Sequence, residues 1–454
     1  MNLDEIVWGD IKTGDELKLA VKDMNGVDSK GRTAFYNVCR RCIPELVEEG
    51  IKLGGKHDNG GKKGKKPLFG ACRTRNIGAV EILLAAGACP NALTDSNYTP
   101  LWVSGRDGMT NIVEALVKHG ADPNWVEERS NTDCMIVACS EGDAETALAM
   151  LNGTISYEVT AVETEGSSAL WVAAAEGHTE LVSALLNLGS DTNRPNNYNR
   201  TPLMAAAFMG HADTCKVLLE NGADVNLSDS NKEGPLYIAC TNGHTAVVEI
   251  LMKHASPDVN EGNAEGETCL ITAAWHGHAD VVAMLIGAGA DVDKQNSNGK
   301  TSLIAACWKS FPEVAKAILD AGADVHKADE HGRTALWAAC RGGAAGCVQV
   351  VIEAGGDPDQ MDDRVGAFDA GAGVSSCTPL FAACWQGHLE AADCMLKNGA
   401  DPELGDSEGR KPADMTEKED IKAVVRKYAE MKYDGTAPPP PSGKGAAAKK
   451  KEGK

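Results

Sequence analysis

The sequence is poor in aromatic residues and in positive charge. Phe, Trp and Tyr make up 5% of the 454 residues, whereas glycine occupies 49 positions, so we expect a core of aliphatic and small side chains. The 44 Lys and Arg residues are outnumbered by 65 Asp and Glu residues, which gives a formal net charge of −21. Because such a chain repels polyanions, this balance argues against direct binding to nucleic acid or to an anionic membrane.

Long apolar runs are also missing. No stretch approaches the roughly 20 apolar residues of a membrane-spanning helix. The first residues, Met1 to Glu5, lack the basic region and apolar core of a signal peptide. We therefore expect a cytoplasmic protein. Three lysines near the end of the chain, Lys449 to Lys451, leave the nucleus as an alternative location.

The cysteines number fifteen, so they cannot all pair within one molecule. Zinc sites need closely spaced cysteine pairs, and Cys39 with Cys42 is the one such pair, without a second to complete a site. Seven cysteines recur at one position of the repeat described below, where other copies carry alanine, which indicates a small buried slot. These seven are Cys39, Cys72, Cys139, Cys240, Cys307, Cys340 and Cys384. We therefore expect buried thiols in a reducing compartment and no metal site.

One pattern recurs along most of the chain. It has a Thr-Pro-Leu-like start, two small residues, Gly-His, an apolar pair and a Gly-Ala-Asp ending, and its clearest starts are Thr99, Thr201 and Thr378. Such a fixed period is typical of repeat architectures. The aligned copies start near residues 33, 66, 99, 133, 168, 201, 234, 268, 301, 334, 378 and 411, and all but one of the steps are 33 to 35 residues.

Each copy predicts two short helices joined by a turn. In the copy that starts at Thr201, apolar or small residues follow at helical spacing, and proline stands at the first helical position. A second apolar stripe ends at Gly222, which can adopt the left-handed cap conformation. A polar segment rich in Asn, Asp and Gly then predicts a turn. A unit of this size cannot bury its own apolar face, so neighbouring units must stack.

The pattern of Thr-Pro-Leu, paired small residues and Gly-His over 33 residues resembles the ankyrin repeat family over about residues 33–433. The resemblance implies an all-α solenoid of helix–turn–helix units with β-turn or hairpin fingers, about eleven full repeats and terminal caps. We expect an N-terminal capping half-repeat over 1–32, the repeat array over 33–410, and a capping repeat over 411–434. An insertion of about eleven residues predicts a long finger loop at 361–377, and residues 435–454 are expected to form a disordered tail rich in Pro and Lys.

No catalytic motif is recognisable, so we expect no enzyme activity and no cofactor. The position seven residues after each start is a better candidate for function, since it is expected to be half-exposed and, in ankyrin proteins, to line a concave groove. Arg and Trp are typical of binding hot spots. The candidate partner-binding residues at this position are Arg40, Arg73, Arg106, Phe208, Trp275, Trp308, Arg341 and Trp385.

Two structural explanations of this row remain open. Each arginine follows an aromatic residue by four positions and can simply stack on it, as Arg106 can on Trp102. The tryptophans can instead be buried between repeats.

We interpret the chain as a non-enzymatic protein–protein interaction scaffold or adaptor. It is expected to be monomeric and to bind a protein segment that is acidic at one end and apolar at the other. The alternatives are a regulatory or inhibitory subunit of an enzyme or cytoskeletal component, and a fragment of a larger enzyme.

Overall fold

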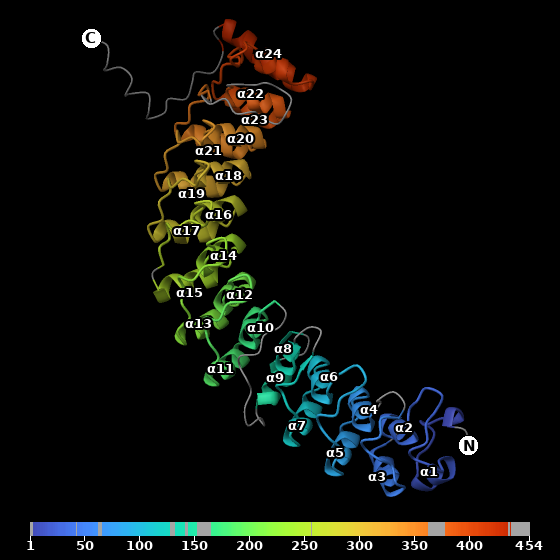
Figure 1. Ribbon diagram of the computed structural model, residues 1–454. Helices are drawn as coiled ribbons and strands as arrows, with labels where there is room; N and C mark the ends of the chain where they lie inside the picture. Colours follow the sequence, from blue (N-terminus) through green and yellow to red (C-terminus); the bar gives the residue numbers. More distant parts are fainter. Residues whose placement is uncertain are drawn as a thin grey trace. The chain divides into compact units, whose positions relative to one another are not determined.

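The computed structural model describes residues 3–41, 43–61, 66–127, 132–140, 144–151, 165–255, 257–361, 377–434 and 436. The chain divides into two compact units, Met1–Asp224 and Val225–Lys454, which we call unit 1 and unit 2. Both consist of helix pairs joined by turns (Figure 1). The expected all-α ankyrin-type architecture is confirmed.

Unit 1 begins with a 3-10 turn, η1 (Leu3–Glu5), and helix α1 (Gly14–Ala20). The first helices of its repeats are α2 (Ala34–Arg41), α4 (Pro67–Arg73), α6 (Pro100–Arg106), α8 (Cys134–Ser140), α10 (Ala169–Ala175) and α12 (Pro202–Met209). The second helices are α3 (Pro44–Lys52), α5 (Ile77–Ala85), α7 (Thr110–Lys118), α9 (Ala144–Leu151), α11 (Thr179–Asn187) and α13 (Ala212–Glu220). Two short strands, β1 (Val126–Glu127) and β2 (Thr132–Asp133), pair antiparallel.

In unit 2 the first helices are α14 (Pro235–Asn242), α16 (Cys269–His276), α18 (Ser302–Trp308), α20 (Ala335–Gly342) and α22 (Pro379–Gln386). The second helices are α15 (Thr245–Ala255), α17 (Ala279–Gly287), α19 (Pro312–Asp320), α21 (Ala345–Glu353) and α23 (Leu389–Lys397). The unit ends with η3 (Pro412–Met415) and α24 (Glu419–Tyr433).

Each first helix begins one residue after a repeat start read from the sequence. At the starts that are Thr or Ser the reason is local, because the hydroxyl oxygen of that residue caps the helix. Thr99 accepts a hydrogen bond from the backbone N–H of Trp102 at 3.1 Å, and Thr378 accepts one from Phe381 at 3.3 Å. Proline follows at the first helical position, where its missing N–H has no partner to lose.

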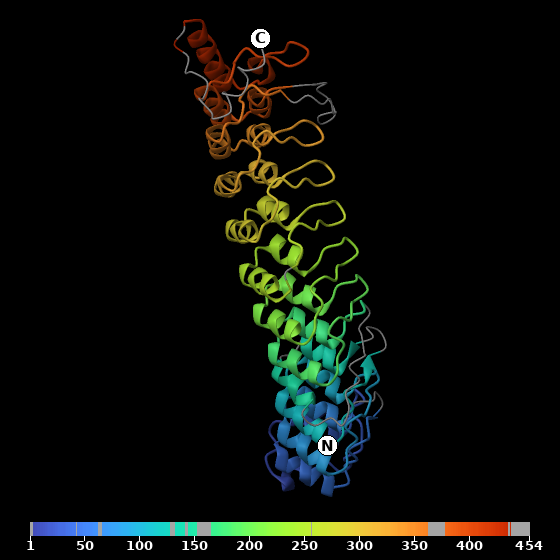
Figure 2. The same ribbon diagram turned by 90° about the vertical axis from the view of Figure 1, so that its left-hand side faces the viewer.

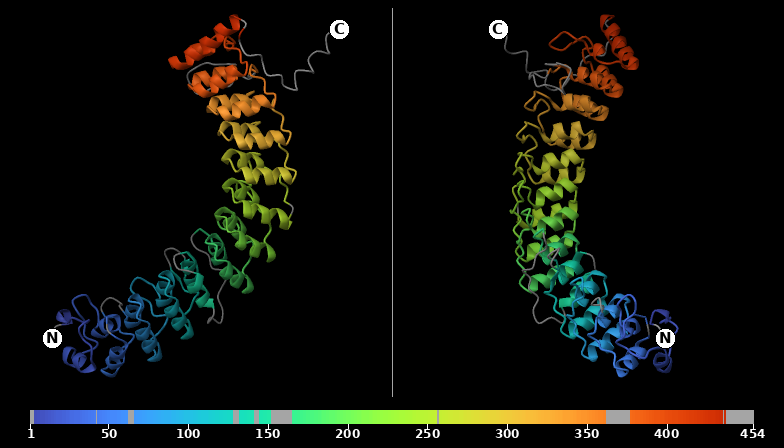
Figure 3. Two further views of the ribbon diagram at one scale, coloured as in Figure 1. Left: turned by 180° about the vertical axis from the view of Figure 1, so that it is seen from behind. Right: turned by 45° about the vertical axis from the view of Figure 1, so that its right-hand side comes forward.

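In unit 2, each first helix packs on the first helix of the next repeat, and the second helices form a parallel row. Figure 1 shows the first helices of this unit on one side of the stack and the second helices on the other, and Figure 3 shows the same rows from two further directions. The turns between repeats project to one side as fingers (Figure 2). Isolated antiparallel bridges close two of these fingers, between Gly262 and Thr268 and between Ala328 and Thr334.

The repeated cysteine position is a buried slot, as the sequence predicts. All seven cysteines there are at most 1% exposed, and they lie on the first helices beside small or aliphatic residues. The described residues form no disulfide bond.

The C-terminal end of unit 2 is covered by α24, which packs on α23. Ile421 and Val425 are buried in this contact, whereas Val424 is only half-buried. Other expectations lie outside the described residues: most of the finger loop, at 362–376, and all of the tail except Thr436.

Candidate functional site

The candidate row is divided between the two units. Unit 1 contains Arg40, Arg73, Arg106 and Phe208, and unit 2 contains Trp275, Trp308, Arg341 and Trp385. All eight residues lie in the last turn of a first helix, and each is half-buried or exposed. The expectation of a half-exposed row therefore holds within each unit, and these tryptophans are not core residues.

In unit 1, stacking of an arginine on its own helix is seen at Arg106. Its guanidinium carbon lies 5.4 Å from the ring centre of Trp102, and its Nε and Nη2 atoms each lie 2.8 Å from a carboxylate oxygen of Asp107. Arg73 is exposed at the equivalent position. The charge of Arg106 is therefore largely compensated within the chain.

In unit 2, the row is part of a larger surface on which aromatic rings alternate with cations. We call this surface the aromatic–cation strip, and it consists of Trp275, Lys300, Trp308, Lys309, Arg333, Trp337, Arg341 and Trp385. Four consecutive first helices, α16 to α22, contribute to it, together with the fingers that precede α18 and α20.

The centre of the strip is Arg341. Its guanidinium carbon lies 5.7 Å from the ring centres of Trp308 and Trp385 and 6.0 Å from that of Trp337. These rings come from three successive repeats, so the arginine joins the repeats together. Cation–π contacts of this kind contribute about 0.5–1 kcal/mol each when exposed and more when desolvated.

A second arginine, Arg333, covers two of these rings from the finger side. Its guanidinium carbon lies 5.5 Å from the ring centre of Trp308 and 5.7 Å from that of Trp337. The carboxylate of Asp329, which is almost fully buried, pairs with Arg333 at 2.6 Å. Arg333 is thus held in place and neutralised.

The strip is anchored by Trp337, which is 1% exposed. Its indole N–H donates to the Cys377 sulfur at 3.5 Å, and its ring packs with Phe381 in a small apolar cluster. Trp308 packs against this cluster from outside, with the two indole rings 6.1 Å apart. Trp337 is therefore structural, whereas Trp308 presents part of its ring to solvent.

The other end of the strip is different. The ammonium groups of Lys300 and Lys309 both lie 4.3 Å from the ring centre of Trp275. Lys300 and Lys309 flank α18, the first helix that packs on the helix of Trp275. Arg333 and Arg341 lie just before and within α20, the first helix that packs on the helix of Trp308. Among the described residues, however, neither ammonium group has an ion-pair partner.

Four members of the strip are not among the candidates that the sequence predicts: Lys300, Lys309, Arg333 and Trp337. Lys300 and Arg333 each stand directly before a repeat start, and Lys309 follows Trp308. A basic residue before a start, combined with Trp late in the preceding first helix, is the sequence signal that could have revealed them.

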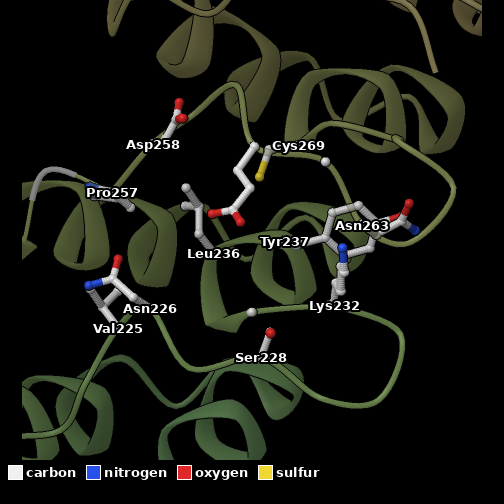
Figure 4. Close-up of a pocket in the computed structure, with 13 residues that line it drawn as sticks. Val225, Asn226, Ser228, Lys232, Leu236, Tyr237, Pro257, Asp258, Asn263 and Cys269 are labelled. Carbon is white, nitrogen blue, oxygen red and sulfur yellow. The ribbon is translucent and has the colours of Figure 1, made fainter. Parts of the chain in front are cut away.

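A separate pocket of about 60 Å³ lies between the first two fingers of unit 2 (Figure 4). In Figure 4, Tyr237 lies beside Asn263, whose side-chain amide donates to the Tyr237 hydroxyl at 3.2 Å. Burial raises the pKa of this hydroxyl, which stays protonated and reaches Glu267 at 3.4 Å. The space suits a few water molecules and is far below the several hundred Å³ of typical small-molecule sites.

The described residues contain no group of three or more His, Cys, Asp or Glu side chains that could hold a metal ion. None of their helices has both the length and the apolar character needed to cross a membrane.

The stacked helix pairs, their projecting fingers and the Thr-capped first helices define a helical-repeat protein. The family model for ankyrin repeats matches residues 36–127, 134–229, 224–296, 284–362 and 303–406. The chain belongs to the ankyrin repeat family.

The chain is similar to several curated proteins over part of its length. An ankyrin repeat and KH domain-containing protein of Caenorhabditis briggsae is 30% identical over 127 residues, which cover 28% of this chain and 5% of that protein. The B-cell lymphoma 3 protein homolog of Mus musculus is 27% identical over 193 residues, or 41% of this chain and 42% of that protein. An Arabidopsis thaliana protein, named provisionally as an E3 ubiquitin-protein ligase, is 30% identical over 100 residues, or 21% of this chain and 22% of that protein.

The matched regions span less than half the length of each of these relatives. The similarity therefore concerns the repeats and not the whole proteins. Ankyrin repeats indicate a protein–protein interaction module and imply protein partners. The name of the Arabidopsis relative shows that such repeats also occur in chains named as enzymes.

Proposed function

We propose that this chain is a non-enzymatic scaffold or adaptor that binds a protein partner through the aromatic–cation strip of unit 2. The observation that carries the proposal is the half-exposed row of Trp275, Trp308 and Trp385 interleaved with cations. Half-buried tryptophans and arginines are the side chains that contribute most to protein interfaces. Their mutual stacking fixes the side chains before binding, which lowers the entropy cost of association.

The strip also differs from the surrounding surface in charge. The chain carries −21 overall, whereas the strip gathers four cations, of which Arg333 pairs with Asp329 in the adjoining finger. A partner with negative charge and apolar side chains would be drawn to this surface and away from the rest of the molecule. We further propose that the protein is a monomer in the cytoplasm, with the nucleus as the alternative.

Site-directed photo-crosslinking tests this proposal. His276 is exposed next to Trp275 on α16, and Lys316 is exposed on α19 in the row of second helices. A photoreactive amino acid placed at His276 should capture a partner from native lysate, and the yield should fall when Trp275→Ala is added. The same probe at Lys316 should capture little. Equal capture at both positions, or capture at Lys316 alone, would show that the strip is not the binding surface.

A further inference from the structure

We propose that Lys300 and Lys309, held over Trp275, recognise an acidic side chain of an extended partner segment, and that the neighbouring ring of Trp308 receives an apolar side chain of the same segment. We call Lys300, Lys309 and the Trp275 ring the lysine clamp. This inference rests on the proposed function, because it names the partner chemistry that the strip accepts.

The first argument is the uncompensated charge of the clamp. Each ammonium nitrogen is 4.3 Å from the same ring centre, so the two nitrogens are no more than about twice that distance apart. Like charges at this distance repel each other, and the repulsion is relieved when an anion binds between or beside them. Although the chain has 65 acidic residues, neither lysine of the clamp has a carboxylate partner among the described residues.

The second argument compares two equivalent repeats. Arg333 precedes its repeat start just as Lys300 does, and the residue four positions earlier is Asp329 in one finger and Asn296 in the other. Both side chains make the same turn, accepting hydrogen bonds from the backbone N–H groups two and four residues later. Only the carboxylate also neutralises the cation. The neutral amide of Asn296 makes the same turn but gives Lys300 no negative partner.

The third argument concerns spacing. Helices α16 and α18 pack directly on each other, and packed helices lie about 8–10 Å apart. Trp275 and Trp308 occupy equivalent places on these helices. An extended segment advances about 3.3 Å per residue. A segment that runs along the strip therefore places an acidic residue at the clamp and an apolar residue about three positions away at Trp308.

The chemistry of the clamp favours carboxylates. Lysine ammonium groups are compact point charges that can donate hydrogen bonds to an anion from several directions. The exposed part of the Trp275 ring adds apolar surface beside them. The partner is therefore an Asp- or Glu-containing segment with a nearby leucine-like or aromatic side chain.

The experiment uses the full chain and a fluorescein-labelled peptide that contains two central glutamates with a leucine three residues to either side. The control peptide carries glutamines in place of the glutamates. The test variant is Lys300→Gln with Lys309→Gln. The matched control is Lys294→Gln with Lys316→Gln, which removes the same charge from exposed positions of the same unit. Fluorescence anisotropy at low and high salt gives the dissociation constants.

We expect the clamp variant to bind the glutamate peptide about three- to thirtyfold more weakly than the native chain. The matched control should change binding less than twofold, and the glutamine peptide should not distinguish the variants. High salt should weaken only the glutamate peptide on chains with an intact clamp, because charges are screened over ~10 Å at 0.1 M. Equal weakening by both lysine pairs, or no binding of the glutamate peptide, would overturn the inference. The photo-crosslinking experiment at His276 does not depend on this peptide. Capture at His276 without a preference for the glutamate peptide would show that the strip binds a partner but does not recognise acidic side chains.

Discussion

The Asp329 carboxylate holds Arg333 through two contacts of 2.6 Å, from Nε and from the terminal nitrogen Nη2, to the same oxygen. The arginine held in this way covers the rings of Trp308 and Trp337. Because Asp329 lies in a finger and the rings lie on helices of two repeats, this ion pair links the finger to the strip.

Substitution of Asp329 tests that link. Asp329→Asn should lower the free energy of unfolding by about 1–2 kcal/mol, because it removes a charged hydrogen-bond partner but preserves the turn. Asp329→Ala should cost more, since the backbone N–H groups of His331 and Arg333 also lose their acceptor. Urea denaturation of the two variants provides the comparison. Equal destabilisation would show that the turn bonds contribute nothing.

The slot occupied by Cys307 provides a test of packing. Cys307 is fully buried on α18. Cys307→Leu should overpack the contact between first helices and cost roughly 1–3 kcal/mol, whereas Cys307→Ala fits a slot that other copies fill with alanine and should be mild. If both variants unfold at the same urea concentration, the position is not a size-limited slot.

Local sequence signals were sufficient to predict the repeats. Where a start is Thr, as at Thr99, its hydroxyl caps the helix that follows, and the cysteine slot follows from its recurrence with alanine. The contacts of the strip could not be read in the same way. Lys300 reaches Trp275 from the finger that leads into α18, so the contact depends on how the finger folds against the helices and not on helical spacing.

The eight residues of the candidate row are half-buried or exposed, as the sequence predicts, but the row omits several residues that contact it in unit 2. The row read from the sequence includes Arg341, Trp308 and Trp385, and the structure adds Trp337 and Arg333 to the contacts around them. The division of the chain into two units left no trace in the repeat pattern. Partner binding by the eight residues of the row remains a prediction.

Acid should weaken unit 2 through Asp406, which pairs with Arg410 at 2.6 Å. Burial by itself would raise the pKa of Asp406, but hydrogen bonds from the Arg410 side chain and from backbone N–H groups outweigh it and lower this pKa. A carboxylate whose folded pKa lies below its unfolded value of about 3.9 stabilises the fold above that value. The stabilisation is lost as pH falls through the folded pKa.

The variant Asp406→Asn isolates this contribution. At pH 7 it should be about 1–2 kcal/mol less stable than the native chain, and the difference should shrink steadily below about pH 4. Urea denaturation between about pH 7 and pH 3 measures both. A difference that stays constant over this range would mean that the ionised carboxylate does not contribute.

The last prediction concerns a variant in which the finger before α18 receives the carboxylate that the finger before α20 already has. Asn296→Asp gives Lys300 the partner that Arg333 already has, while the new carboxylate can still accept from the backbone N–H groups of Asn298 and Lys300. Lys300 should then pair with this introduced carboxylate in place of an external anion, so the glutamate peptide should bind about threefold more weakly or worse.

The substitution Asn296→Asp also affects Glu267, and a second substitution separates this effect from the effect on Lys300. The amide of Asn296 donates to a carboxylate oxygen of Glu267 at 3.4 Å, and a carboxylate there would repel Glu267 instead. Adding Glu267→Gln should restore stability lost in this way and leave peptide binding weak, because the charge of Lys300 stays compensated. Recovery of binding on adding Glu267→Gln would show that the loss came from a distorted finger, and that the clamp does not depend on the uncompensated charge of Lys300.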